Sequence, residues 1–195
     1  MKKILFLDSA IVKKGLSFTT AAMDEFQRVA GDVERINLND TEFANYSLNA
    51  NNYPEYWNLV NGEKWIDKLK ETDLLVISSS LINFMTPAVL KNFFDGISIP
   101  NKTFSYKLSK DGYPVGLLTN LNVVVISSQG ASQEPGTTSL QNQWLKTVLS
   151  FIGAKSIEFI EINGTKMPSL INVNPDDYAK TLTKEFERIL AKINN

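Results

Sequence analysis

Short runs of consecutive apolar residues recur along the chain and predict buried strands. The three strongest runs span residues 3–8, 73–79 and 122–127, and two weaker ones span 33–38 and 156–162. A strand that is apolar at successive positions has both faces covered, as in a parallel sheet with helices on either side. The pattern therefore predicts a parallel sheet at the centre of the molecule.

Helix start and stop signals lie between these runs. Ser17 is a favourable N-cap residue, and Gly31 is placed to end the helix that it opens. Thr86 followed by Pro87 predicts an N-cap and a first helical position, and Asn174 predicts the cap of a last helix.

Apolar residues at helical spacing give these helices a buried face. A further, weaker helix is expected between residues 54 and 70. The predicted faces are Ala22, Phe26, Val29 and Ala30; Leu90, Phe93, Phe94 and Ile97; Leu140, Trp144, Val148 and Ile152, ended by Gly153; and Tyr178, Leu182, Phe186, Ile189 and Ile193 in one continuous helix.

Five strands that alternate with five helices predict a three-layer α/β fold, because parallel strands need right-handed crossovers. The doubly wound strand order 2-1-3-4-5 suits a five-stranded chain better than the six-stranded alternative. A length of 195 residues with 43% hydrophobic content is enough for one core, so we expect residues 1–195 to form a single domain.

Composition excludes several kinds of chemistry. The net charge of -1 offers no field for nucleic acid or an anionic membrane surface. The chain has neither cysteine nor histidine, so we expect no thiolate nucleophile and no metal site. The first apolar run is cut at Asp8 without a cleavage site, and no stretch approaches the ~18 residues that span a bilayer, so we expect a cytoplasmic protein. Its chemistry is therefore expected to come from a bound cofactor.

Three loops follow the strands whose carboxyl ends meet where the strand order reverses, which is where ligands bind in such sheets. The loop 9–19 opens a helix, and Ser17 and Thr19 add hydroxyl donors to its free N–H groups, as a phosphate site requires. Ser17 acting only as a helix cap is the alternative.

The other two loops suit a flat ring. In the loop 78–84, the apolar Leu81, Ile82 and Phe84 can lie against a ring while Asn83 satisfies its polar edge, or they can simply continue the core. The small residues of 127–136 allow close approach to backbone N–H groups, or form an ordinary turn. The long connection 100–120 is a candidate wall for a substrate site.

Four segments carry a resemblance to a known family. They are Asn83-Phe84, residues 90–95 (Leu-Lys-Asn-Phe-Phe-Asp), residues 103–106 (Thr-Phe-Ser-Tyr) and residues 151–153 (Phe-Ile-Gly). With them the chain resembles the FMN-dependent, NADH-using azoreductases, a branch of the flavodoxin-like quinone reductases. The likeness runs from residue 3 to the last helix.

The resemblance implies a homodimer with one FMN per subunit, which passes electrons from NADH to quinones and azo compounds by ping-pong turnover at a shared site. No side chain is implied as an acid or base. The residues implied are Ser9, Ser17, Phe18 and Thr19 at the phosphate; Leu81, Ile82, Asn83, Phe84, Ser128, Gln129, Gly130 and Ala131 at the flavin; and Tyr106 and Phe151 in the substrate-site wall.

The chain departs from the family at two places. Leu81-Ile82 stand where such enzymes often have Met-Tyr, and Gln129 and Ala131 stand where they often have Arg and Gly. An electron carrier of the flavodoxin type, without an organic substrate, is the main alternative, although such carriers tend to be strongly acidic and this chain is near neutral. A flavin-free α/β module is the third possibility.

Overall fold

The structure is a computed structural model that describes residues 2–12 and 15–194. Its main elements, in chain order, are β1 (Ile4–Asp8), α1 (Phe18–Ala30), β2 (Glu34–Asn37), α2 (Tyr56–Leu59), α3 (Gly62–Glu71), β3 (Leu74–Ser80), α4 (Ala88–Ile97), β4 (Phe104–Ser105), β5 (Val115–Gly116), β6 (Asn122–Gln129), α5 (Leu140–Phe151), β7 (Ser156–Asn163), α6 (Pro175–Lys180) and α7 (Thr183–Asn194). Two short 3₁₀ helices, Leu38–Asp40 and Glu42–Ala44, follow β2.

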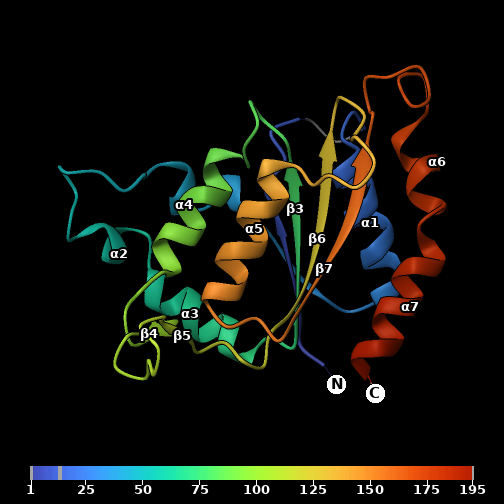
Figure 1. The fold of residues 1–195 in the computed structure, drawn as a ribbon. Helices are drawn as coiled ribbons and strands as arrows, with labels where there is room; N and C mark the ends of the chain where they lie inside the picture. Colours follow the sequence, from blue (N-terminus) through green and yellow to red (C-terminus); the bar gives the residue numbers. More distant parts are fainter. Residues whose placement is uncertain (1, 13–14, 195) are drawn as a thin grey trace.

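The predicted sheet is confirmed in strand number, direction and order. Five strands pair in parallel in the order β2-β1-β3-β6-β7, which is 2-1-3-4-5 when the main strands alone are numbered. Helices α4 and α5 cover one face and α1, α6 and α7 the other, so the molecule has three layers (Figure 1).

Alternate residues of each strand feed two separate cores. On the central strand β3, Leu75 and Ile77 pack with α3, α4 and α5, whereas Leu74 and Val76 pack with α1 and α7. Consecutive apolar residues are needed because both faces of the sheet are covered. This explains why the strands were readable from the sequence.

Helix boundaries agree with the prediction at some positions and not at others. Ser17 caps α1, with its Oγ accepting a hydrogen bond from the backbone N–H of Thr20 at 3.1 Å. The prediction for α4 is wrong by one residue, since Pro87 occupies the N-cap position and the helix begins at Ala88. Thr86 does not cap this helix; its buried hydroxyl lies 2.7 Å from that of Ser79 on β3.

Two helices predicted as continuous are broken. The segment 54–70 contains α2 and α3, separated by Asn61 in the left-handed conformation (φ 54°). The last helix is divided into α6 and α7 where the hydroxyls of Thr181 and Thr183 donate to the carbonyls of Tyr178 and Lys180. Threonine side chains compete with the backbone for its carbonyl groups, which explains the break.

The predicted face of α5 is also displaced. Leu140 is exposed, and Leu145 and Leu149 form the buried centre of the face, with Trp144 and Val148 partly buried beside them. The capping of the helix by Ser139, whose Oγ accepts from the N–H of Asn142, places Leu140 in the first turn, outside the core.

The connection 100–120 lies at the amino edge of the sheet, at the bottom of Figure 1. Helix α4 runs from the carboxyl edge to the amino edge, and the chain then forms the small β4–β5 hairpin before it enters β6. Gly116 of this hairpin lies against Gly153, which follows α5. The connection is therefore far from the carboxyl ends of the five-stranded sheet in the same chain.

Candidate functional site

The first loop leads into α1, whose N-terminus lies at the carboxyl edge of the sheet. Ser17 and Thr19 at the start of α1 are buried, and their hydroxyl oxygens lie 3.0 Å apart. Phe18 lies between them in sequence and packs edge to face on Tyr178 of α6, at 5.5 Å between ring centroids. Burial raises the pKa of Tyr178. Lys13 and Lys14 of this loop lie outside the described residues.

A row of hydroxyl groups extends from this helix across the strand ends. Thr19 Oγ1 lies 3.4 Å from Ser80 Oγ at the end of β3, and Ser128 Oγ of β6 donates to Ser80 Oγ at 3.3 Å. These bonds are long, and each hydroxyl can either donate or accept, so the directions of the bonds can change. Together with the free N–H groups of the first turn, the row is suited to an anionic, oxygen-rich ligand.

Ser9 is placed differently from the other predicted phosphate ligands. It is fully buried, its backbone N–H donates to Ser78 Oγ at 2.9 Å, and its hydroxyl donates to Ser78 O at 2.6 Å. A phosphate contact from Ser9 would require this pair to open. In the structure Ser9 joins the ends of β1 and β3.

Arg35 of β2 also fixes the start of the first loop. Its guanidinium group donates to both carboxylate oxygens of Asp8, to Asp24 at 2.6 Å and to Gln27 at 2.9 Å. Burial acts to lower the pKa of Arg35, but the bonds and charges of Asp8 and Asp24 outweigh it and raise that pKa. Strands β1 and β2 and helix α1 are thereby tied together below the loop.

The second loop forms a tight turn with a strained backbone. Ile82 and Met85 exchange two backbone hydrogen bonds, at 2.8 and 3.0 Å, and the two residues between them have positive φ, 48° for Asn83 and 70° for Phe84. A phenylalanine is rarely found in the left-handed region. The turn nevertheless leaves the Phe84 side chain 73% exposed. Strained residues of this kind cluster at binding sites.

The third loop is held by the loop that follows β7. The carbonyls of Gln129, Gly130 and Ala131 accept hydrogen bonds from the N–H groups of residues 165, 166 and 164, at 3.1, 3.0 and 2.8 Å. The Gln129 side chain is buried, and one of its amide hydrogens is donated to Gln133 Oε1. Within the described residues its second amide hydrogen forms no further bond and can donate to a ligand.

These loops line one cavity of about 540 Å³ at the carboxyl edge. It is lined by residues 12, 15–18, 80–81, 128–130, 165–166, 171, 173 and 175. Of the predicted ligand residues, Ser17, Phe18, Leu81, Ser128, Gln129 and Gly130 lie in this lining. Thr19 belongs to the hydroxyl row beneath it, whereas Ile82, Asn83, Phe84 and the exposed Ala131 lie outside the lining.

Buried polar side chains support the ends of β3 and β6 from the opposite face. Ser79 Oγ donates to Gln141 Oε1 at 3.0 Å, and Asn142 Nδ2 donates to Ser127 Oγ at 3.1 Å. These bonds join α5 to the strands that carry the second and third loops, so the two loops share one rigid support.

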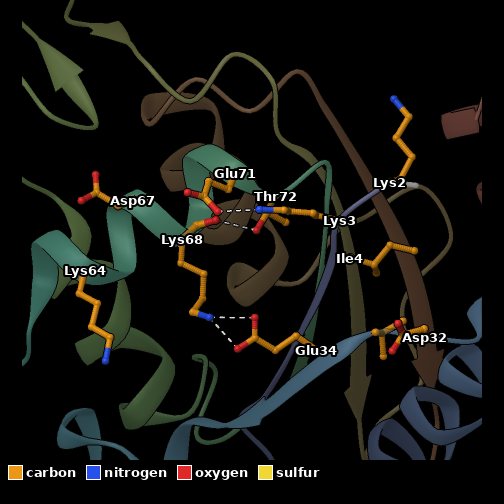
Figure 2. A pocket seen from close by; sticks show the side chains of 11 residues that line it. Lys2, Lys3, Ile4, Asp32, Glu34, Lys64, Asp67, Lys68, Glu71 and Thr72 are labelled. Atoms are coloured by element: carbon orange, nitrogen blue, oxygen red, sulfur yellow. Dashed lines mark hydrogen bonds and ion pairs between the residues drawn. The ribbon is translucent and has the colours of Figure 1, made fainter.

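A larger cavity of about 750 Å³ lies at the amino ends of β1 and β2 (Figure 2). Its charges are mostly paired, as in the ion pairs Lys3–Glu71 and Lys68–Glu34. It has no helix N-terminus or row of hydroxyls among its described lining residues. Although it is larger, its neutralised surface makes it a poorer ligand site than the carboxyl-edge cavity.

Tyr106 and Phe151 lie away from the cavity. Both pack on Phe104 of β4, with ring centroids 5.6 and 4.4 Å apart. This places them at the amino edge, and β6 alone, with 8 residues, separates the two edges by roughly 25 Å. Neither side chain reaches the cavity of its own chain, so their role in the wall of a site shared between two chains stays a prediction.

Within the described part of the chain, no helix is both long and apolar enough to span a membrane. The same residues contain no cluster of three or more acidic, histidine or cysteine side chains that could hold a metal ion.

Sequence reasoning missed the contribution of the segment after β7. Thr165, Lys166, Ile171 and Val173 all line the cavity. Only the register of β6 against β7, which pairs Gln129 with Asn163, brings this segment beside the third loop. The strand order predicted from the sequence could have indicated this neighbour, but not which side chains face the cavity.

Comparison with known proteins gives a consistent result. Residues 2–186 match the family described as having a flavodoxin-like fold. The FMN-dependent NADH:quinone oxidoreductase of Mycoplasmopsis synoviae (strain 53) is 36% identical over 191 residues, covering 95% of this chain and 96% of that protein. The FMN-dependent NADH:quinone oxidoreductase 2 of Mesoplasma florum is 32% identical, and each chain is covered completely.

The fold also matches solved structures. The crystal structure of an FMN-dependent NADH-azoreductase from Bacillus anthracis in complex with FMN superposes with a TM-score of 0.74, at 20% identity and full coverage of both chains. An NAD(P)H:quinone oxidoreductase from Methanothermobacter marburgensis superposes with a TM-score of 0.66, at 13% identity, over 96% of this chain and 98% of the other.

Proposed function

The chain belongs to the flavodoxin-like family of FMN-dependent NADH:quinone oxidoreductases, and from this premise we propose that its carboxyl-edge cavity binds FMN and that the enzyme reduces quinones and azo compounds. The observation that carries the assignment to this cavity is the meeting of three separate loops around it. Each was expected to contact the cofactor, and each has a different chemical character.

The donors present fit such a ligand. The α1 N-terminus with Ser17 and the hydroxyl row would hold the phosphate, and Leu81 and the third loop would contact the isoalloxazine ring. When bound, FMN supplies two-electron transfer between NADH and the acceptor. The second amide hydrogen of Gln129 would donate to the polar edge of the ring.

The second loop would position the ring and its partners from outside the cavity. Phe84 offers an exposed aromatic face, and its backbone is fixed by the turn between Ile82 and Met85. A fixed face lowers the entropy that stacking a flat nicotinamide or quinone ring would cost.

We propose a homodimer in which the amino edge of one chain completes the site of the other. Tyr106, Leu108 and Tyr113 in the connection 100–120 are 63%, 57% and 75% exposed. Clustered exposed aromatic and apolar side chains are typical of interaction surfaces. Since Tyr106 and Phe151 cannot reach the cavity of their own chain, a second copy is the means by which they would wall a substrate site.

Anaerobic spectroscopy tests the function. FMN is added to the purified protein, the excess is removed, and visible spectra are recorded before and after addition of NADH. We expect flavin bands that bleach with NADH and return when a quinone is added. Bound flavin that NADH does not bleach would favour an electron carrier, and a colourless protein would favour a flavin-free module.

Light scattering at micromolar concentration tests the dimer. We expect twice the mass of the 21.8 kDa chain. Phe151→Ala is expected to lower quinone reduction while FMN affinity is kept, with Phe159→Ala on β7 as a control for general loss of packing. A fully active monomer would refute the shared site. We further propose that residues 1–195 act as a single cytoplasmic domain.

A further inference from the structure

Lys166 is the one charged side chain among the described residues that line the carboxyl-edge cavity. The other lining residues described are apolar, small, hydroxylic or amide-bearing. A phosphate monoester carries about -1.5 to -2 charges at pH 7. Hydroxyls and a helix N-terminus solvate such a group, but they do not neutralise it.

The backbone of Lys166 is firmly placed. Its N–H donates to Gly130 O at 3.0 Å, and its neighbours Thr165 and Gly164 bond to the carbonyls of Gln129 and Ala131. The aliphatic stem lies over Gly130, because a Cβ added to that glycine would stand 3.0 Å from Lys166 Cγ. The pairing of β6 with β7 thus fixes the backbone of Lys166 beside the third loop.

Lys166 also has no ion-pair partner among the described residues. In the part of the chain that the structure describes, no carboxylate forms an ion pair with it, whereas Lys3, Lys68 and Lys180 are each paired. An unpaired ammonium at the rim of a polar cavity is available to an anionic ligand.

The α1 N-terminus, at Ser17 and Phe18, shares the cavity lining with Lys166, as do Leu81 and the third loop, which would contact the ring. Of these two parts of FMN, the phosphate carries the negative charge in the oxidised cofactor, so it is the group that an ammonium matches. We propose that Lys166 binds the phosphate of FMN together with the helix N-terminus, and so makes the site selective for the phosphorylated flavin. This inference rests on the proposed function.

The test compares FMN with riboflavin, which lacks the phosphate. Dissociation constants are measured by flavin fluorescence quenching in the wild type, Lys166→Met, Lys166→Arg and the control Lys155→Met, whose lysine is exposed at the amino edge. We expect Lys166→Met to weaken FMN binding by about tenfold or more and to leave riboflavin binding unchanged. Arginine should restore most of the affinity, and the Lys155 variant should match the wild type.

Salt gives an independent readout. The FMN affinity of the wild type should fall more steeply with ionic strength than that of Lys166→Met. Unchanged FMN affinity in Lys166→Met would overturn the proposal, and so would equal weakening of FMN and riboflavin, which would place the lysine at the ring or in the fold. A wild type that binds neither flavin would instead remove the proposed function itself.

Discussion

Replacing Phe84 with glycine or alanine separates the cost of its backbone conformation from the value of its ring. Phe84 has φ 70°, and a residue with a Cβ in the left-handed region costs about 1–2 kcal/mol. Glycine escapes this cost. Alanine keeps it, and both variants lose the same aromatic ring.

The contribution of the ring to the fold is small. Since the side chain is 73% exposed, truncation uncovers only a minor part of its surface, worth about 1–2 kcal/mol in either variant. Glycine loses about 0.5–1 kcal/mol through the greater freedom of the unfolded chain. Subtracting the middle of this range from the middle of the range for strain relief leaves Phe84→Gly more stable than Phe84→Ala by about 0.5–1 kcal/mol.

Urea denaturation of the FMN-free protein measures this difference, which corresponds to a midpoint shift of roughly 0.2–0.5 M. Lys146, exposed in the middle of α5, is the control, because there glycine should be less stable than alanine by about 1 kcal/mol. An alanine variant at position 84 as stable as the glycine variant would show that the turn is unstrained. Both Phe84 variants should bind FMN more weakly than the wild type.

Three other changes test the site and its support. Ser17→Glu sets a carboxylate against the phosphate and should weaken FMN binding by several kcal/mol in flavin titration; undiminished affinity would move the phosphate elsewhere. Gln129→Arg should raise the midpoint potential of bound FMN by about 30 mV for each ~1.4 kcal/mol of added stabilisation, and an unchanged potential in anaerobic redox titration would place residue 129 away from the ring. The hydrogen bond from Arg28 lowers the pKa of Glu25 from 4.5 to about 2, so Glu25 stabilises the fold at neutral pH and loses this effect as pH falls through that window. Glu25→Gln should therefore flatten the decline in unfolding free energy between pH 5 and pH 3, measured with urea, and equal slopes would contradict the assignment.

The sequence predicted secondary structure well where the types of neighbouring residues are enough to determine it. Strands such as β3 could be predicted because both of their faces are buried. The N-cap role of Ser17 could be predicted because a helix cap depends only on the next three residues. The breaks at Asn61 and between Thr181 and Thr183 could not be predicted, since they depend on backbone angles and hydroxyl bonds that the apolar pattern does not show.

The site was predictable by loop but not by side chain. Parallel topology fixes which loops meet, and it also implies that the connection after α4 lies at the opposite edge, so Tyr106 could be expected to wall only a site shared with a second chain. The inward bond of Ser9 and the arrival of Lys166 beside Gly130 depend on strand register, which the sequence did not provide.

The contact between Gly116 and Gly153 limits how this chain can vary. A Cβ on Gly116 would stand 2.2 Å from Gly153 N, and one on Gly153 would stand 2.6 Å from Gly116 C. In an ordinary core, enlarging one side chain is often offset by shrinking its neighbour. Here the neighbour is already glycine and the obstacle is backbone, so neither residue can compensate for a change in the other.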